Sequence, residues 1–197
     1  MGTIIKESLA ISTSYDEYRK KVGNLIEEGK STGLNQSADL LNYSTLNDAR
    51  MNRLDKKITL TDATIDALKS TKEKQTWLLI TEGWCGDAAQ IGPVINKMSL
   101  ESEKVDLKVV LRDENDALMN QFLTNGTKSI PKLVVLNAND EVISSWGPRP
   151  SLATKMVNDY KIKNGGLDAD FKRDLQVWYN KDKGENIQDD LVAFLEK

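Results

Sequence analysis

The chain of 197 residues contains no histidine and only one cysteine, Cys85. Zinc sites and Cys–His catalytic pairs are built from imidazole or from several thiols, and an internal disulfide needs two cysteines. All three are therefore excluded, and neither a metal ion nor another cofactor is expected. Any chemistry that Cys85 performs must work without imidazole.

The chain also lacks long runs of one charge and long apolar runs. Its 27 basic and 30 acidic residues leave a net charge of -3, which argues against nucleic acid and anionic membranes as partners. No apolar segment is long enough to span a membrane, and residues 1–7 lack the basic and apolar regions of a signal peptide. We therefore expect a cytoplasmic protein, with enough hydrophobic residues for the core of one domain with extensions.

Helical periodicity dominates the first 55 residues. Ser14 and Glu17 have the spacing of a capping box, and the helix that follows is expected to end at Gly29. Apolar residues from Leu40 to Leu54 predict one longer helix or two short ones. The sequence therefore predicts an entirely helical N-terminal extension over residues 1–55.

Strand and helix patterns alternate in the middle of the chain. Strands are predicted at 77–81, 105–111, 132–137 and 141–146. The first two are separated by a helix and should pair in parallel, whereas the last two should form an antiparallel hairpin. A further helix is expected to begin at Asp113. The sequence thus predicts an α/β fold with a central mixed sheet flanked by helices, in a single domain with a core at 56–163 and a C-terminal helical segment at 164–197.

Cys85 lies where the predicted strand at 77–81 gives way to a helical pattern. At a helix N-terminus, unpaired backbone N–H groups and the positive end of the helix dipole stabilise a thiolate. A single cysteine at an arbitrary position is more often an inert buried thiol. The position directly after a strand favours a nucleophilic thiol instead.

Three sequence landmarks carry a resemblance to the thioredoxin fold: Trp84–Gly86, Pro93 eight residues after the cysteine, and Ile130–Pro131 before the hairpin. They are similar in order and spacing to the Trp-Cys-Gly opening, the helix proline and the cis-proline of thioredoxins. The surrounding sequence resembles a bacterial subfamily of thioredoxin-like proteins with helical extensions. The resemblance covers about residues 60–162 and implies a thioredoxin-like sheet.

The site departs from the family pattern at two positions. Ala88 stands where the second cysteine of a C-x-x-C motif would be, and Leu79 stands where thioredoxins carry a buried aspartate. The Cys-Gly-Asp-Ala site is therefore monothiol, and an external thiol must resolve any mixed disulfide. Glu82 and Asp87 lie near the sulfur and disfavour a thiolate. We therefore predict that the pKa of Cys85 is lowered by less than in dithiol family members.

The resemblance implies a complete set of site residues. The predicted site comprises the catalytic Cys85 and five substrate-binding residues: Trp84, Gly86, Asp87, Ile130 and Pro131. A cis Pro131 would face the sulfur, and Ile130 would bind the main chain of an extended peptide by hydrogen bonds of the added-strand type. Trp84 is expected to form a flat apolar rim beside the thiol.

Two further features leave alternatives open. Arg112 and Arg149 could each hold the carboxylate of a cosubstrate, but pairing with a surface acid such as Asp113 is favoured. The first 55 residues could cover the edge of the sheet or roof the active site, and periodicity does not distinguish these arrangements.

Two functions also remain open. In the first, Cys85 forms a mixed disulfide with a protein disulfide or a sulfenylated protein and is released by a small-molecule thiol or a reductase, which would make the protein a monothiol disulfide oxidoreductase. In the second, the fold is a redox-inactive binding module for an extended peptide or a partner protein. A dimer linked through Cys85 is disfavoured in a reducing cytoplasm.

Overall fold

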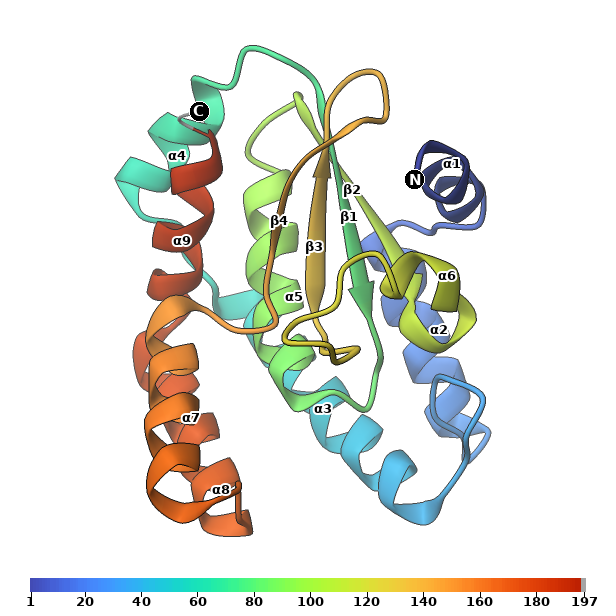
Figure 1. Cartoon of the computed structure of the whole chain (residues 1–197), viewed down its shortest axis with the longest axis vertical. Coiled ribbons are helices and arrows are strands. Elements are labelled where there is room, and N and C mark those ends of the chain that lie inside the picture. Colours follow the sequence, from blue (N-terminus) through green and yellow to red (C-terminus); the bar gives the residue numbers. More distant parts are fainter. Residues whose placement is uncertain (196–197) are drawn as a thin grey trace.

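A four-stranded mixed sheet forms the centre of the computed structural model, which describes residues 1–195 (Figure 1). The strands are β1 (Gln75–Thr81), β2 (Val105–Leu111), β3 (Lys132–Leu136) and β4 (Val142–Trp146). Their order in the sheet is β2-β1-β3-β4, in which β1 and β2 pair in parallel and the other pairs are antiparallel. The predicted parallel pair, the hairpin and the mixed sheet are confirmed.

Helices surround the sheet on both faces (Figure 1). They are α1 (Gly2–Ala10), α2 (Tyr15–Glu27), α3 (Ala38–Lys57), α4 (Asp62–Lys69), α5 (Gly86–Ser99), α6 (Asp116–Met119), α7 (Ser151–Asn164), α8 (Ala169–Asp182) and α9 (Glu185–Leu195). The apolar pattern that left one or two helices open between Leu40 and Leu54 forms the single helix α3. Among residues 1–195, no helix is both long and apolar enough to cross a membrane.

The alternating side chains of β1 build two separate cores, because successive residues of a strand point to opposite faces of the sheet. Trp77 and Leu79 pack in a large cluster with α5 and with residues of α2, α3 and the C-terminal helices. Leu78 and Ile80 pack on the other face with Ile5 of α1 and with α6. Cys85 belongs to this second, smaller cluster.

Local sequence patterns predicted the start of α2 correctly, but they did not predict the structure after Asp113. The capping box before α2 is confirmed, since the Glu17 N–H donates to Ser14 Oγ at 3.2 Å and the Ser14 N–H donates to the Glu17 carboxylate at 2.8 Å. The prediction of a helix that begins at Asp113 was wrong. Residues Arg112–Glu114 form a 3₁₀ turn, and α6 has only four residues. The Asp113 carboxylate pairs with Arg112 and does not cap a helix.

The N-terminal extension covers the edge of the sheet. The Thr13 N–H donates to the Val109 carbonyl at 2.9 Å, and the Val109 N–H donates to the Thr13 carbonyl at 2.8 Å. This antiparallel bridge occupies the free edge of β2, where unpaired backbone groups would otherwise invite other strands. The expectation that residues 1–55 are entirely helical was therefore wrong at Thr13.

Candidate functional site

Cys85 occupies the junction between β1 and α5. It is the N-cap residue of α5, whose first helical residue is Gly86. Its Sγ donates a hydrogen bond to the carbonyl oxygen of Ile130 at 3.4 Å, and only 9% of the residue is exposed. The structure thus brings Cys85 and Ile130 into direct contact, although the sequence places them far apart.

The backbone around Pro131 closes this side of the site. The peptide bonds Ile130–Pro131 and Gly147–Pro148 are both cis. Gly147 has φ +110, and a side chain there would collide with the carbonyl oxygen of Pro131. Only glycine allows the chain after β4 to approach Pro131 this closely.

The environment of the sulfur disfavours ionisation. Burial raises the pKa of the Cys85 thiol to about 12, and the negative charge of Asp87 adds to this rise. Backbone N–H groups of Asp87 and Ala88 at the start of α5, together with the Arg149 guanidinium, lower the pKa by less. The prediction of a lowered pKa was therefore wrong, because the loss of solvent outweighs the helix N-terminus.

Asp87 is held away from solvent by two residues from later in the chain. Arg149 Nη2 lies 2.6 Å from Asp87 Oδ2, and the Tyr179 hydroxyl donates to Asp87 Oδ1 at 3.0 Å. Burial raises the pKa of Asp87, while Arg149 and Tyr179 favour its charged form. Arg149 thus pairs with a buried acid rather than a surface acid, and its Nε is buried without a hydrogen-bond partner in residues 1–195.

Trp84 forms a half-buried ring next to the thiol, covered by an arginine. The Arg112 guanidinium carbon lies 4.7 Å from the centre of the Trp84 ring, a cation–π arrangement. Arg112 Nη2 also lies 2.7 Å from Asp113 Oδ1, which confirms the predicted pairing. A groove of about 350 Å³ borders this pair and is lined by Leu34, Asn35, Arg112, Asp113, Asp116 and Lys128.

The N-terminal extension holds the turn that precedes the cysteine. The Gly83 N–H donates to Thr32 Oγ1 at 2.8 Å, and Asn47 Nδ2 donates to the Gly83 carbonyl at 2.9 Å. Glu82 is fully buried, and its Oε1 accepts the Asp113 N–H at 2.9 Å. Its Oε2 has no hydrogen-bond partner in the described part of the chain. The extension therefore holds the turn before the cysteine as well as covering the sheet edge.

The C-terminal helix α8 reaches the first turn of α5 from another side. Gln90 Nε2 donates to Gln176 Oε1 at 3.0 Å. A side chain at Gly86 would meet Gln176 Nε2 at 3.4 Å and Arg50 Nη1 at 3.9 Å. Helices α3 and α8 therefore flank the residue that follows the cysteine. Sequence reasoning missed Gln176, Tyr179, Thr32 and Asn47, because no local pattern links residues so far apart.

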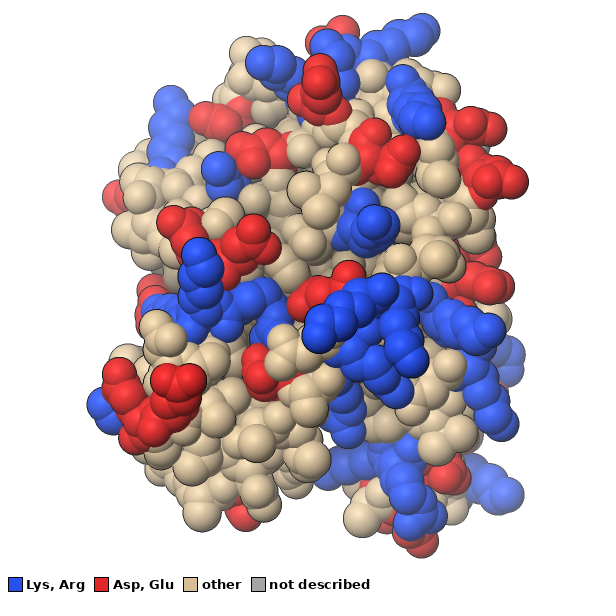
Figure 2. Space-filling view, turned by 180° about the vertical axis from the view of Figure 1, so that it is seen from behind, with Lys and Arg blue, Asp and Glu red and all other residues tan. Residues whose placement is uncertain are grey.

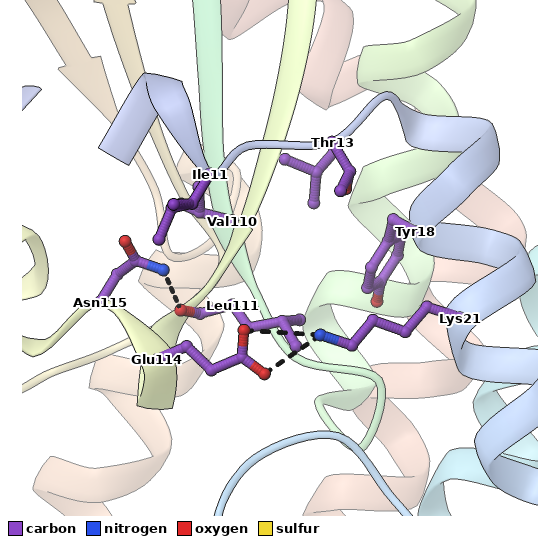
Figure 3. Close-up of a pocket in the computed structure, with 9 residues that line it drawn as sticks. Ile11, Thr13, Tyr18, Lys21, Val110, Leu111, Glu114 and Asn115 are labelled. Carbon is purple, nitrogen blue, oxygen red and sulfur yellow. Dashed lines mark hydrogen bonds and ion pairs between the residues drawn. The ribbon is translucent and has the colours of Figure 1, made fainter. Parts of the chain in front are cut away.

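A second cavity lies away from the thiol, between α2, β2 and the 3₁₀ turn (Figure 3). Lys21 Nζ lies 3.1 Å from Glu114 Oε1 across its rim, and Asn115 Nδ2 donates to the Leu111 carbonyl at 2.9 Å. Its volume of about 30 Å³ holds a single water molecule, so it is too small for a substrate. Within residues 1–195 no cluster of three or more potential metal ligands occurs.

Comparison with known proteins identifies the family. A family model described as thioredoxin matches residues 33–161. Among solved structures, a protein of unknown function from Pseudomonas aeruginosa has a TM-score of 0.66 at 17% identity, with 97% of this chain and 96% of that chain covered. An HIV epitope-scaffold has a TM-score of 0.59 at 16% identity, with 93% and 98% covered. None of the curated proteins compared with the chain matches it. Because the family match spans more than half of the chain, the protein belongs to the thioredoxin family, a family of thiol-redox proteins.

Proposed function

We propose that this protein carries out thiol–disulfide exchange through Cys85 alone, with a mixed disulfide to a partner protein as the intermediate. The observation that carries the proposal is the position of the sulfur. It lies at the N-terminal end of α5, 3.4 Å from the Ile130 carbonyl oxygen and beside Pro131. A partner segment that docked along Ile130 and Pro131, between Trp84 and the first turn of α5, would bring its own disulfide next to this sulfur.

The proposed exchange balances within the sulfur atoms involved. The Cys85 thiolate attacks one sulfur of the partner's disulfide, that bond breaks, and the other partner sulfur leaves as a thiolate that takes a proton from water. A sulfenylated partner reacts in the same way, with hydroxide as the leaving group. Because Ala88 replaces a second thiol, an external thiolate then attacks the partner's sulfur, and Cys85 leaves as a thiolate.

Burial makes this thiol latent in the free protein. Because burial raises the pKa of Cys85 to about 12, very little of the thiol is ionised at neutral pH. Small disulfide reagents should therefore react more slowly with Cys85 than with free cysteine. A docked partner that opened the sulfur to solvent would remove the largest cause of the raised pKa, so reactivity should depend on the partner.

Intact-mass spectrometry of the full chain, after incubation with peptide disulfides and with cell extract, tests the proposal. We expect one adduct per chain, located on Cys85, absent from the Cys85→Ser variant and removed by an added small thiol. A native protein that forms no adduct with any partner, while the unfolded chain reacts normally, would mean that Cys85 is only a packing residue. The chain would then be a binding module without redox activity.

A further inference from the structure

Two arginines on α3 carry charge that no acid neutralises. Arg50 and Arg53 are three residues apart and share one face of the helix. Arg50 Nη1 donates to Asn47 Oδ1 at 2.6 Å, and Arg53 Nη2 donates to Asn180 Oδ1 at 2.6 Å. In the described part of the chain, no carboxylate lies within ion-pair distance of either guanidinium. The amide oxygens thus orient both side chains and leave their positive charge unpaired.

Arg50 lies beside Gly86, the residue that follows the cysteine. Arg50 Nη1 and Gln176 Nε2 both come within 4 Å of the position that a side chain at Gly86 would take. Gln176 accepts a hydrogen bond from Gln90 through Oε1, so its Nε2 keeps donors for a ligand. We call Arg50, Arg53, Gln176 and Asn180 the arginine surface. It combines two fixed cations with amide donors at the active-site end of α5.

The arginine surface is the centre of a wider basic region. In Figure 2 the blue side chains gather over the second half of α3 and over α8, and a hollow lies at the lower edge of this face. Lys56 and Lys57 at the end of α3, Lys181 of α8 and Lys183 directly after α8 are all exposed. Burial and the nearby charge of Arg53 both lower the pKa of Arg50, as expected where like charges gather. In a chain of net charge -3, such a concentration on one face is a local feature.

We propose that the arginine surface binds an acidic segment of the partner protein and so delivers the adjacent disulfide to Cys85. The inference rests on the proposed redox function and names the chemistry of its partner. Guanidinium groups bind carboxylates by paired, charge-assisted hydrogen bonds. The positive end of the α5 dipole adds to the attraction beside Gly86. The net negative charge of the whole chain disfavours extended polyanions such as nucleic acid, which points to a short acidic peptide.

The rate of mixed-disulfide formation tests this inference. Three peptide disulfides of equal length would carry Asp, Asn or Lys on both sides of the cysteine. At low salt we expect the acidic peptide to react about tenfold faster than the basic one, with the difference shrinking as salt screens the charges. The Arg50→Gln and Arg53→Gln variants should lose this preference. Lys74→Gln removes the same charge at an exposed site before β1 and should keep it.

A binding measurement separates this inference from the redox proposal. Fluorescence anisotropy would follow an acidic peptide without cysteine on the full-length Cys85→Ser variant, with Arg50→Lys added as a folded, charge-conserving control. Binding that Arg50→Gln abolishes and Arg50→Lys only weakens supports the arginine surface, because lysine keeps the charge but not the paired hydrogen bonds. This support would stand even if no adduct ever formed on Cys85, a result that would count against the redox proposal alone. Equal reaction rates for the three peptides, or equally tight binding of a short oligonucleotide, would overturn the inference and leave the exchange chemistry standing.

Discussion

The two ends of the chain hold the active-site turn in different ways. The N-terminal extension contacts the residues before the cysteine, where Thr32 and Asn47 bond to both main-chain groups of Gly83. The C-terminal helix α8 contacts the residues after it, where Tyr179 bonds to the carboxylate of Asp87. The N-terminal extension thus binds neutral main-chain groups, whereas α8 binds a charged side chain.

This difference separates geometry from electrostatics. Hydrogen bonds to the main chain of Gly83 fix the path of the turn without changing any charge near the sulfur. The contacts to Asp87 hold a negative charge that raises the pKa of Cys85. The N-terminal extension should therefore determine how firmly the turn is held, whereas the charge of Asp87, which Arg149 and Tyr179 hold in place, should determine how reactive the thiol is.

The largest expected effect concerns the docking of the C-terminal segment. Gly184, between α8 and α9, has φ +83, and a side chain there would lie 2.7 Å from Val94 Cγ2 of α5. Gly184→Ala should lower the free energy of unfolding by about 3 kcal/mol, from backbone strain and overpacking together. Urea denaturation of the full chain measures this loss.

Gly165 provides the matched control. It has a similar φ of +74, but a side chain there would meet nothing within 4 Å. Gly165→Ala should therefore lower the free energy of unfolding by only about 1 kcal/mol, from the backbone alone. Equal losses for the two variants would mean that the contact between Gly184 and α5 does not hold the C-terminal segment.

The next prediction compares how much the N-terminal and the C-terminal contacts to the turn contribute to stability. Asn47 is buried, and Asn47→Ala would leave the Gly83 carbonyl without its donor, which should lower the free energy of unfolding by about 2 kcal/mol. Gln176 on α8 is half-buried, and Gln176→Ala should cost about 0.5 kcal/mol. Thermal and urea unfolding of both variants measure the difference. A larger loss for Gln176→Ala would reverse the comparison.

The same comparison explains which parts of the fold were predictable. Local signals were sufficient where a few adjacent residues decide the structure, as at the Ser14 cap, the apolar strand β1 and the junction at Cys85. They failed at Asp113, whose carboxylate would cap a helix in isolation but pairs with Arg112, while its N–H donates to Glu82. Because Glu82 comes from another segment of the chain, the periodicity around Asp113 could not predict this hydrogen bond.

The sequence predicted the position of Cys85 at the start of a helix, but it did not predict the electrostatics of the site. The resemblance implied that Pro131 faces the sulfur and that Ile130 binds the main chain of a peptide, whereas in the structure the Ile130 carbonyl accepts a hydrogen bond from Cys85 Sγ. Cys85 is buried in a cluster that also contains residues of α6 and Ile130, and no short sequence pattern encodes this packing. The network at Asp87 joins residues as much as 92 positions apart. The sign of the pKa shift therefore emerged only from the folded chain.

A smaller effect is expected for the charge of Asp87 on the reactivity of Cys85. Asp87→Asn removes a negative charge that raises the pKa of Cys85, so the pKa should fall and the thiolate fraction should rise. We expect alkylation of Cys85 at mildly alkaline pH to become about tenfold faster. The rate of loss of free thiol with iodoacetamide measures this. Tyr179→Phe, which keeps the charge of Asp87, should change the rate far less. If Asn47→Ala accelerated alkylation as much as Asp87→Asn, the contacts before and after the cysteine would not differ in their effect on the thiol.

The smallest effect lies on the N-terminal side, at the buried Glu82. Burial raises the pKa of this carboxyl, and the negative charge of Asp113 adds to the rise. Hydrogen bonds from the Thr32 hydroxyl and the Asp113 amide, together with the charge of Arg112, lower the pKa by less. A group whose pKa is raised on folding stabilises the native state below its unfolded pKa, and that contribution is lost as the pH rises through the native pKa. Relative to Glu82→Gln, the wild-type free energy of unfolding should therefore fall as the pH rises above about 4.3, the ordinary value of a glutamate. Urea denaturation of both proteins across this range measures the difference. A difference that stays constant with pH would mean that folding does not raise the pKa of Glu82. Glu82 would then be ionised in the native state, and the residues before the cysteine would also carry a charge.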